Sequence, residues 1–303
     1  MNYKLTGLML LLLAIAGCSE GGTTSTTEGY YSCFGDENQM IEAYFADYAP
    51  MSSESNTYQP GEQIDIEVVL ENKMPTEISE GKVKVRLTGD AAIDTIFSGA
   101  SVETNTDLYA ADQDTCNAND DEVNIGPLVY LKEIDTKISK DIEGQYCYEM
   151  PVEVQGFLYF TEDETEIGDN LPSGANPPSS VRITAIEQEI VDVDRDSNTG
   201  ELRFKVTIQN TGDGTIVEDL DECFQYRETG YREYVTLSVE GAYRPECSEE
   251  VKLSRDTKEE IITCKVYDVD VGNLGSNPSE IKFTLDGFAY EDSIDAVTIW
   301  LEP

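Results

Sequence analysis

Residues 200–210 read Gly-Glu-Leu-Arg-Phe-Lys-Val-Thr-Ile-Gln-Asn, and polar and apolar side chains alternate from Leu202 to Ile208. Successive side chains of a β-strand point to opposite faces of the sheet, so this period of two places the apolar residues on one face. An amphipathic helix would need a period near 3.6 instead. The stretch therefore predicts a strand with one buried and one wet face, which ends at a turn at Asn210.

The same pattern recurs in the first half of the chain and indicates an internal repeat. Residues 61–72, Gly-Glu-Gln-Ile-Asp-Ile-Glu-Val-Val-Leu-Glu-Asn, are the counterpart of the stretch above, and they also end at an asparagine. Residues 83–89 align without a gap with residues 235–241, again with alternating polarity. Each half therefore repeats one order of strands.

A third repeated block predicts a closing strand in each half. It consists of Tyr148-Glu149 with 152–154 in the first half, and Tyr290-Glu291 with 294–296 in the second. Further candidate strands, 40–44 and 181–186, precede the first block of each half, and no long amphipathic helix is predicted. The fold class is therefore predicted to be all-β, with two tandem immunoglobulin-like β-sandwich domains.

Composition places the domain boundaries between the repeats. Residues 163–179 are acidic and then rich in Gly, Asn, Pro and Ser, which is typical of a semi-stiff linker. This predicts a first sandwich over 36–162 and a second over 180–303. Each is long enough to bury its own core.

The N-terminus predicts export and a lipid anchor. Residues 1–17 contain a short apolar run after Lys4, too short to span a bilayer as a helix, and they read as a secretory signal peptide. Its end, Ile15-Ala16-Gly17-Cys18, resembles the lipobox of bacterial and archaeal lipoproteins, in which cleavage before Cys18 leaves the acylated first residue. The alternative is an ordinary signal peptide with an incidental cysteine. Residues 18–35 are rich in Gly, Ser and Thr and predict a flexible tether, so the protein is expected to be membrane-anchored by lipid at the cell surface, facing outside the cytoplasm.

Charge narrows the range of partners. The chain has 61 acidic and 20 basic residues, a net charge of -41 and a pI near 4.1. Nucleic acids and anionic headgroups are bound by clustered Lys and Arg, so a nucleic-acid partner is excluded. The acid excess resembles that of proteins from salt-loving organisms, where salt screens self-repulsion.

Six cysteines remain for disulfides once Cys18 carries lipid, as suits an exported chain. Cys247 and Cys264 flank a polar turn symmetrically, so a hairpin would bring them within bridging reach. The pairing of the other four is left open, and the odd number in each half leaves either one bridge between domains or free thiols. These four are Cys33, Cys116, Cys147 and Cys223.

The side chains available for catalysis are few. The chain contains no histidine, which excludes Ser-His-Asp and Cys-His catalysis and most zinc hydrolase sites, so we expect no enzyme activity, no catalytic residue and no cofactor. Alternating carboxylates at Asp192, Asp194 and Asp196 resemble the start of a calcium loop, although Arg195 and a missing glycine depart from that pattern. The alternative interpretation is a solvated hairpin turn around Asn198.

The strand-asparagine-turn segments resemble a known family. Residues 70–78, Leu-Glu-Asn-Lys-Met-Pro-Thr-Glu-Ile, and 208–216, Ile-Gln-Asn-Thr-Gly-Asp-Gly-Thr-Ile, are similar to the turn of CARDB-like (cell-adhesion-related) domains of archaeal and bacterial surfaces. The first departs from the family by having Met-Pro in place of glycine, and the second half carries an insertion near 220–231. The resemblance implies seven-stranded sandwiches in tandem with a role in adhesion or spacing.

Two functions remain after these exclusions. The first is a non-enzymatic surface module for adhesion, spacing or protein interaction, whose partner is a surface protein or an envelope polymer. The second is a lipoprotein that binds Ca²⁺ or a cationic solute for a membrane partner, with the acidic surface as the attractor.

Overall fold

The computed structural model describes residues 33–35, 37–89, 97–98, 106–112, 114–161, 167–194, 196–225, 232–254, 258–270 and 278–303. Every regular element in these residues is a β-strand, so the all-β prediction is confirmed. The strands of the first half are β1 (Ile41–Phe45), β2 (Thr57–Tyr58), β3 (Gln63–Ile64), β4 (Glu67–Asn72), β5 (Val83–Thr88), β6 (Phe97–Ser98), β7 (Asn119–Asn124), β8 (Leu128–Tyr130), β9 (Ile138–Tyr148) and β10 (Val152–Leu158). The second half contributes β11 (Val181–Asp194), β12 (Thr199–Asn210), β13 (Thr215–Val217), β14 (Arg232–Gly241), β15 (Glu250–Ser254), β16 (Glu259–Asp270), β17 (Ser279–Asp286) and β18 (Ala289–Leu301).

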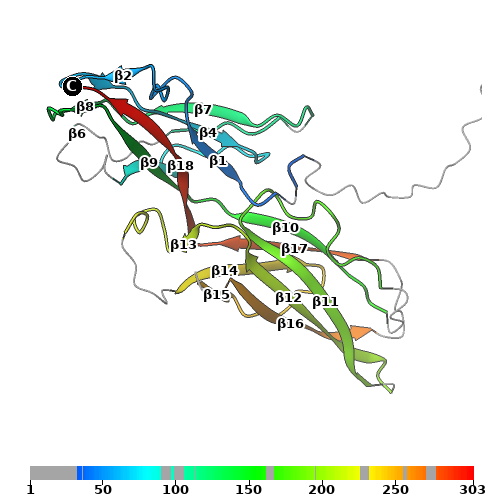
Figure 1. Ribbon diagram of the computed structural model, residues 1–303. Helices are drawn as coiled ribbons and strands as arrows, with labels where there is room; N and C mark the ends of the chain where they lie inside the picture. The colour runs from blue at the N-terminus through cyan, green and yellow to red at the C-terminus, as the bar shows by residue number, and fades with distance from the viewer. Residues whose placement is uncertain are drawn as a thin grey trace, which may run out of the picture.

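The strands form two lobes, drawn one above the other in Figure 1. In the first lobe, at the top, the sheet β1-β4-β7 packs against the sheet β5-β9-β18-β13, in which β2 also pairs with β18, and a small sheet β3-β8-β6 lies beside them. Two contacts join the large sheets: the Tyr146 hydroxyl donates to the Ile41 carbonyl at 3.0 Å, and the Phe45 ring approaches Gly144. The buried apolar faces of the two sheets make the core of this lobe.

The second lobe pairs the sheet β11-β12-β16 with the sheet β10-β17-β14-β15. Phe204 of β12 meets Phe283 of β17 edge to face across the interior, with ring centroids 6.4 Å apart. Both rings are buried. This lobe is therefore also consistent with a β-sandwich.

Burial follows the alternation read from the sequence. In β5 the apolar residues Val83, Val85 and Leu87 are buried, while the polar residues between them are partly exposed. β12 alternates in the same way over its twelve residues. The sequence pattern thus predicted which face of each strand points into the core.

The repeated strands occupy equivalent places, with one exchange. The sheets β1-β4-β7 and β11-β12-β16 correspond strand for strand, as do the pairs β5-β9 and β14-β17. The third strand beside each pair comes from the other half of the chain: β18 pairs with β9, and β10 pairs with β17, both antiparallel. The predicted closing strands are therefore exchanged between the lobes, and strand pairing crosses the boundary expected between 36–162 and 180–303.

The segment expected to join the two domains has a different place. It connects β10 to β11, and both of these strands belong to the second lobe. From residue 167 it is described, and it packs against that lobe: Asn176 is buried and exchanges hydrogen bonds of 2.8 and 3.0 Å with the backbone of Ile183. In its described part the Pro-rich segment is therefore packed against the second lobe.

Candidate functional site at the junction of the two lobes

The two lobes meet at a junction, where the chain passes from β17 of the second lobe into β18, which belongs to the sheet of the first lobe. Tyr290, near the start of β18, pairs with Tyr148 at the end of β9, and the two rings lie 5.8 Å apart. Both side chains are buried, and burial raises the pKa of Tyr290 to about 12 and also raises the pKa of Tyr148. The neutral tyrosine pair thus marks the register at which the exchanged strand begins.

A buried asparagine ends the second strand of each repeat. In both Asn72 and Asn210 the side-chain oxygen accepts the N–H two residues further on, at 2.9 and 3.2 Å. In both, the side-chain nitrogen donates to the carbonyl four residues further on, at 2.9 and 3.1 Å. The strand-asparagine-turn pattern is therefore one hydrogen-bonded turn used twice.

The second of these turns is seated on β18. The N–H of Gly214 donates to the hydroxyl of Tyr290 at 2.8 Å. A Cβ atom at Gly214 would lie closer than 3.0 Å to the Glu291 carbonyl oxygen, and one at Gly212 would lie equally close to the Tyr290 hydroxyl. Glycine is required at both positions because the turn and the strand approach each other so closely.

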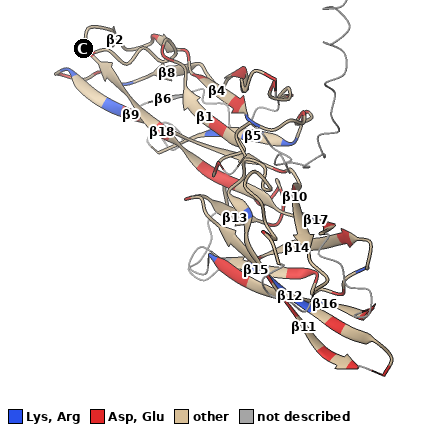
Figure 2. Ribbon diagram, turned by 90° about the vertical axis from the view of Figure 1, so that its right-hand side faces the viewer, with Lys and Arg blue, Asp and Glu red and all other residues tan. Residues whose placement is uncertain are grey.

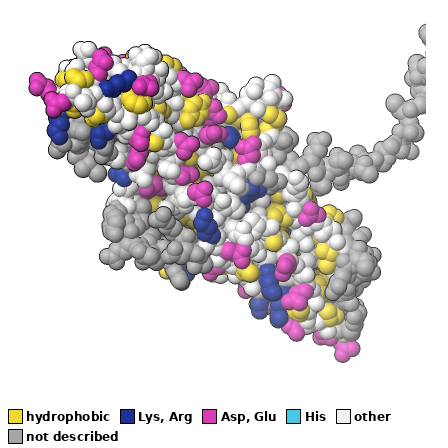
Figure 3. All heavy atoms as spheres, viewed as in Figure 1, with side chains coloured by type: hydrophobic (Ala, Val, Ile, Leu, Met, Phe, Trp, Pro, Cys, Tyr) yellow, Lys and Arg dark blue, Asp and Glu magenta, His cyan; other side chains and the backbone are white. Residues whose placement is uncertain are grey.

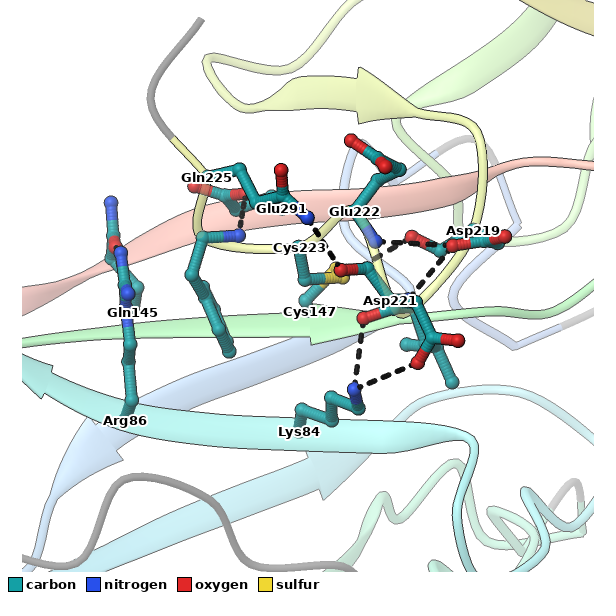
Figure 4. The surroundings of a disulfide bond; sticks show 12 residues. Lys84, Arg86, Gln145, Cys147, Asp219, Asp221, Glu222, Cys223, Gln225 and Glu291 are labelled. Atoms are coloured by element: carbon teal, nitrogen blue, oxygen red, sulfur yellow. Dashed lines mark hydrogen bonds and ion pairs between the residues drawn. A yellow bond between two sulfur atoms is a disulfide. The ribbon is translucent and has the colours of Figure 1, made fainter.

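A segment of the second half, the strap (residues 218–225), covers the outer face of the sheet β5-β9-β18 (Figure 4). A disulfide between Cys147 of β9 and Cys223 of the strap bonds the two halves of the chain. Lys84 of β5 donates to the Leu220 carbonyl at 3.0 Å and lies 3.5 Å from the Asp221 carboxylate. The strap is thus held by one covalent bond and by polar contacts to the neighbouring strand.

Aromatic and apolar contacts complete the attachment of the strap. The Arg86 guanidinium lies over the Phe224 ring, 4.5 Å from its centroid, and the Phe224 N–H donates to the Glu291 carboxylate at 2.7 Å. Beneath it lies a small buried cluster, separate from the main core, made of Cys147, Val217, Leu220, Cys223, Phe224 and Ala289. The insertion predicted near 220–231 therefore serves, as far as 225, to bind the second half of the chain to the first.

A polar cleft of about 530 Å³ also opens at the junction. Carboxylates outnumber ammonium groups in its lining, and Lys73 is bound by Glu37 at 3.0 Å and by Glu42 at 2.9 Å. Burial lowers the pKa of Lys73, but its hydrogen bonds to these two carboxylates outweigh that effect and raise it. Burial, with further contributions from nearby carboxylates, raises the pKa of Asp292. The lining consists of Glu37, Asn38, Gln39, Lys73, Thr211, Gly212, Asp213, Asp292, Ser293 and Asp295.

The acidic residues of the described surface spread over both lobes (Figure 2). On the face drawn in Figure 3, carboxylates appear singly or in small groups, and hydrophobic side chains form small separate patches. Among the described residues drawn on that face, no large apolar patch appears.

The six cysteines of the described region form three disulfides. Cys247 is bonded to Cys264, the pair expected from the sequence, but β15 and β16 lie in opposite sheets and do not form the expected hairpin. An isolated antiparallel bridge pairs Glu246, which precedes β15, with Lys265 of β16, and this bridge brings the neighbouring cysteines together instead. The four cysteines whose pairing was open form Cys33–Cys116 within the first half and Cys147–Cys223 between the halves.

The three aspartates of the candidate calcium loop do not converge. Asp192 lies 3.0 Å from Arg203, while Asp194 accepts the N–H of Asp196 at 2.9 Å and caps a turn. These hydrogen bonds lower the pKa of Asp194. In the described part of the chain no group of three acidic or cysteine side chains gathers as a metal site. The geometry favours the solvated turn, in which Asn198 has a positive φ of 54°.

Cys18, the signal peptide and most of the tether lie outside the described residues, so the lipid anchor stays a prediction. Within the described ranges no helix has the length and apolar character needed to cross a membrane. Three disulfides are typical of chains that fold outside the cytoplasm. The described structure therefore agrees with an extracytoplasmic protein.

Comparisons with known proteins do not assign the chain to a family. No family model matches the chain, and no curated protein matches it. Among solved structures, one match is the Serine-rich Repeat Adhesion Glycoprotein (Srr1) from Streptococcus agalactiae, which is 13% identical and covers 89% of this chain and 98% of that chain. Its TM-score is 0.17, and a score this low supports no structural argument.

Proposed function

We propose that the protein is a non-enzymatic cell-surface lipoprotein whose two joined lobes form an adhesion, spacer or protein-interaction module. The observation that carries the proposal is the junction, where exchanged strands and the Cys147–Cys223 disulfide join the halves into one body. Such a body presents its loops and sheet faces in a fixed arrangement relative to one another. The absence of histidine from the sequence and the all-β fold fit a role without catalysis.

Membership of the CARDB-like family is part of this proposal. Its support is the asparagine turn, which has the same two hydrogen bonds at Asn72 and at Asn210. The acid-coated surface further fits a saline habitat, in which salt shortens the range of charge repulsion.

The anchor and the surface role are tested together in cells that express the full chain. A labelled fatty acid is expected to attach to the mature protein, and Cys18→Ser is expected to remove the label and release the protein into the medium. Photo-reactive side chains at the exposed positions Tyr109 and Tyr234 would then capture the partner on intact cells. Cross-links that require Cys18 support the proposal. An unlabelled protein, or one that captures nothing at either position, contradicts it.

A second candidate function rests on the polar cleft at the junction, and we infer that its ligand would be a small cation. Its lining carries four carboxylates and one lysine, and that lysine is already paired with glutamates. Calorimetry with spermidine and with calcium, each against the Asp213→Asn/Asp295→Asn variant, tests this function. Saturable binding that the variant loses, with a rise in melting temperature, supports it. Equal heats for both proteins refute it.

A further inference from the structure

The closing strands match their partners in length only when they are exchanged. β9 has eleven residues and pairs with β18 at ten positions, whereas β10 has only seven residues. β17 has eight residues and pairs with β10 at seven positions, whereas β18 has thirteen. If each closing strand folded back on its own half, β9 would lose part of its ladder and β18 would extend past the end of β17. Unpaired backbone groups in such positions are unfavourable.

The chain crosses between the lobes at four places. The exchange of closing strands produces the link 149–151 between β9 and β10 and the link 287–288 between β17 and β18. The other two crossings lead from β12 into β13, which pairs with β18, and from the strap into β14. A single flexible linker lets two domains rotate, but several covalent connections remove that freedom.

The buried side chains of the crossing strands couple the two cores. Ile299 and Leu301 of β18 are fully buried in the first lobe, although they follow the second lobe in the sequence. Val152 and Val154 of β10 are buried beside β17 in the second lobe, although they follow the first. Each core therefore loses a strand if the other lobe unfolds.

We propose that the exchanged closing strands form a clamp, which holds the two lobes in one orientation and makes them unfold as a single unit. The proposed function uses the joined lobes, but the clamp does not depend on what the protein binds. Its tests use neither a partner nor the lipid anchor, so their failure is distinguishable from failure of the proposed function. The clamp also explains why the links at 149–151 and 287–288 are short.

Four exposed or half-exposed positions distinguish the exchanged arrangement from the alternative. In the structure Gln145 lies opposite Ser293, and Gln155 lies opposite Lys282. If each closing strand formed a hairpin with its own half, Gln145 would lie opposite Gln155 and Lys282 opposite Ser293. Directly opposite residues have Cβ atoms about 4.5–5.5 Å apart, so a cysteine pair can close with a small shift.

Each of the four cysteine pairs is introduced into the otherwise unchanged mature chain, and disulfide-linked peptides are identified by mass after oxidation. Closure of 145 with 293 and of 155 with 282 is expected, while the other two pairs are expected to stay open. Closure of 145 with 155 or of 282 with 293 overturns the proposal. Failure of all four pairs to close counts against it equally.

Unfolding measurements test the coupling itself. The sequence contains one tryptophan, Trp300 on β18, and its fluorescence reports on the first lobe, whereas hydrogen exchange of β12 reports on the second. The two transitions are expected to coincide, and Val206→Ala in the core of the second lobe is expected to shift both by the same amount. The two transitions must still coincide in Cys147→Ala/Cys223→Ala, because the strands and not the disulfide couple the lobes. Separate transitions in the wild-type chain or in that variant overturn the clamp.

Discussion

Removal of the disulfide between the halves is the most direct perturbation of the junction. Cys147 and Cys223 are 76 residues apart in the sequence, and a cross-link over a loop of that length removes about 4.5 kcal/mol of chain entropy from the unfolded state. We therefore expect Cys147→Ala/Cys223→Ala to lower the free energy of unfolding by about that amount. The strap is expected to loosen with it, because its remaining attachments are noncovalent: polar contacts to Lys84 and Glu291, the contact of Phe224 with Arg86, and a small apolar cluster.

The chain offers a matched control for this variant. Cys247 and Cys264 are only 17 residues apart, so the same relation gives about 3 kcal/mol for Cys247→Ala/Cys264→Ala. Urea unfolding followed by circular dichroism measures both changes, and hydrogen exchange at Phe224 shows whether the strap opens. The reasoning fails if the variant at Cys147 and Cys223 costs less than the control, or if Phe224 stays equally protected in both.

Three further perturbations test other parts of the junction and the surface. Gly214→Ala is expected to destabilise the protein by about 1–3 kcal/mol, because the new Cβ atom would press on the backbone of β18. In the control Gly241→Ala the nearest atoms to the new Cβ atom would be 3.6 Å away, so this variant is expected to be nearly neutral in thermal melts. Burial raises the pKa of Asp292 above its ordinary value of 3.8, so stability is lost as pH rises through the folded-state pKa and the side chain becomes charged. Asp292→Asn should therefore melt at a higher temperature than the wild type at pH 7. An equal or lower melting temperature at that pH would contradict this. The net charge of -41 makes the surface carboxylates repel one another. Raising NaCl from 0.1 to 1 M shortens the Debye length from about 10 to about 3 Å, so it is expected to raise the melting temperature. An unchanged melting temperature would show that surface repulsion is unimportant.

The sequence predicted the strands well because their signal is local. Alternation in 83–89 and 200–210 reports burial on one face, and the structure buries those residues as expected. The asparagine turns were also predictable, since Asn72 and Asn210 form them with backbone groups two and four residues further on, although Asn72 also donates to the Tyr109 carbonyl at 2.8 Å. Local patterns of this kind do not depend on which other strand completes the sheet.

The exchange of strands was not predictable from the same patterns. β10 and β18 have similar alternation, and either could pair with β9 if alternation alone decided. Their partners are decided by ladder length and by the links at each end, which are properties of the assembled sheets. The pairing of Asp192 with Arg203 was not predictable for a related reason, since Arg203 is brought to it by the hairpin of β11 and β12; the calcium interpretation stays a prediction.

The cleft and the strap gave only partial signals in the sequence. An odd number of cysteines in each half left open one bridge between the halves, and the insertion near 220–231 was visible as extra length. Nothing local showed that Cys223 would reach Cys147, because the partner lies in a different repeat. The lining of the cleft is equally dispersed, with residues from four separate parts of the chain.

The register of β18 is fixed at its two ends by different means, and a bulge reconciles them. Near the junction Tyr290 and Ile294 face the core, but near the C-terminus the buried residues are Ile299 and Leu301, which have the opposite parity. The pairing with β9 shifts between Ile294 and Val297, where β18 advances three residues against two on β9, and this one extra residue changes the buried face. Without that shift, the pairing set by Tyr290 at the junction would turn Ile299 and Leu301 toward solvent. The bulge is therefore what allows one strand to serve both the junction and the far end of the first core.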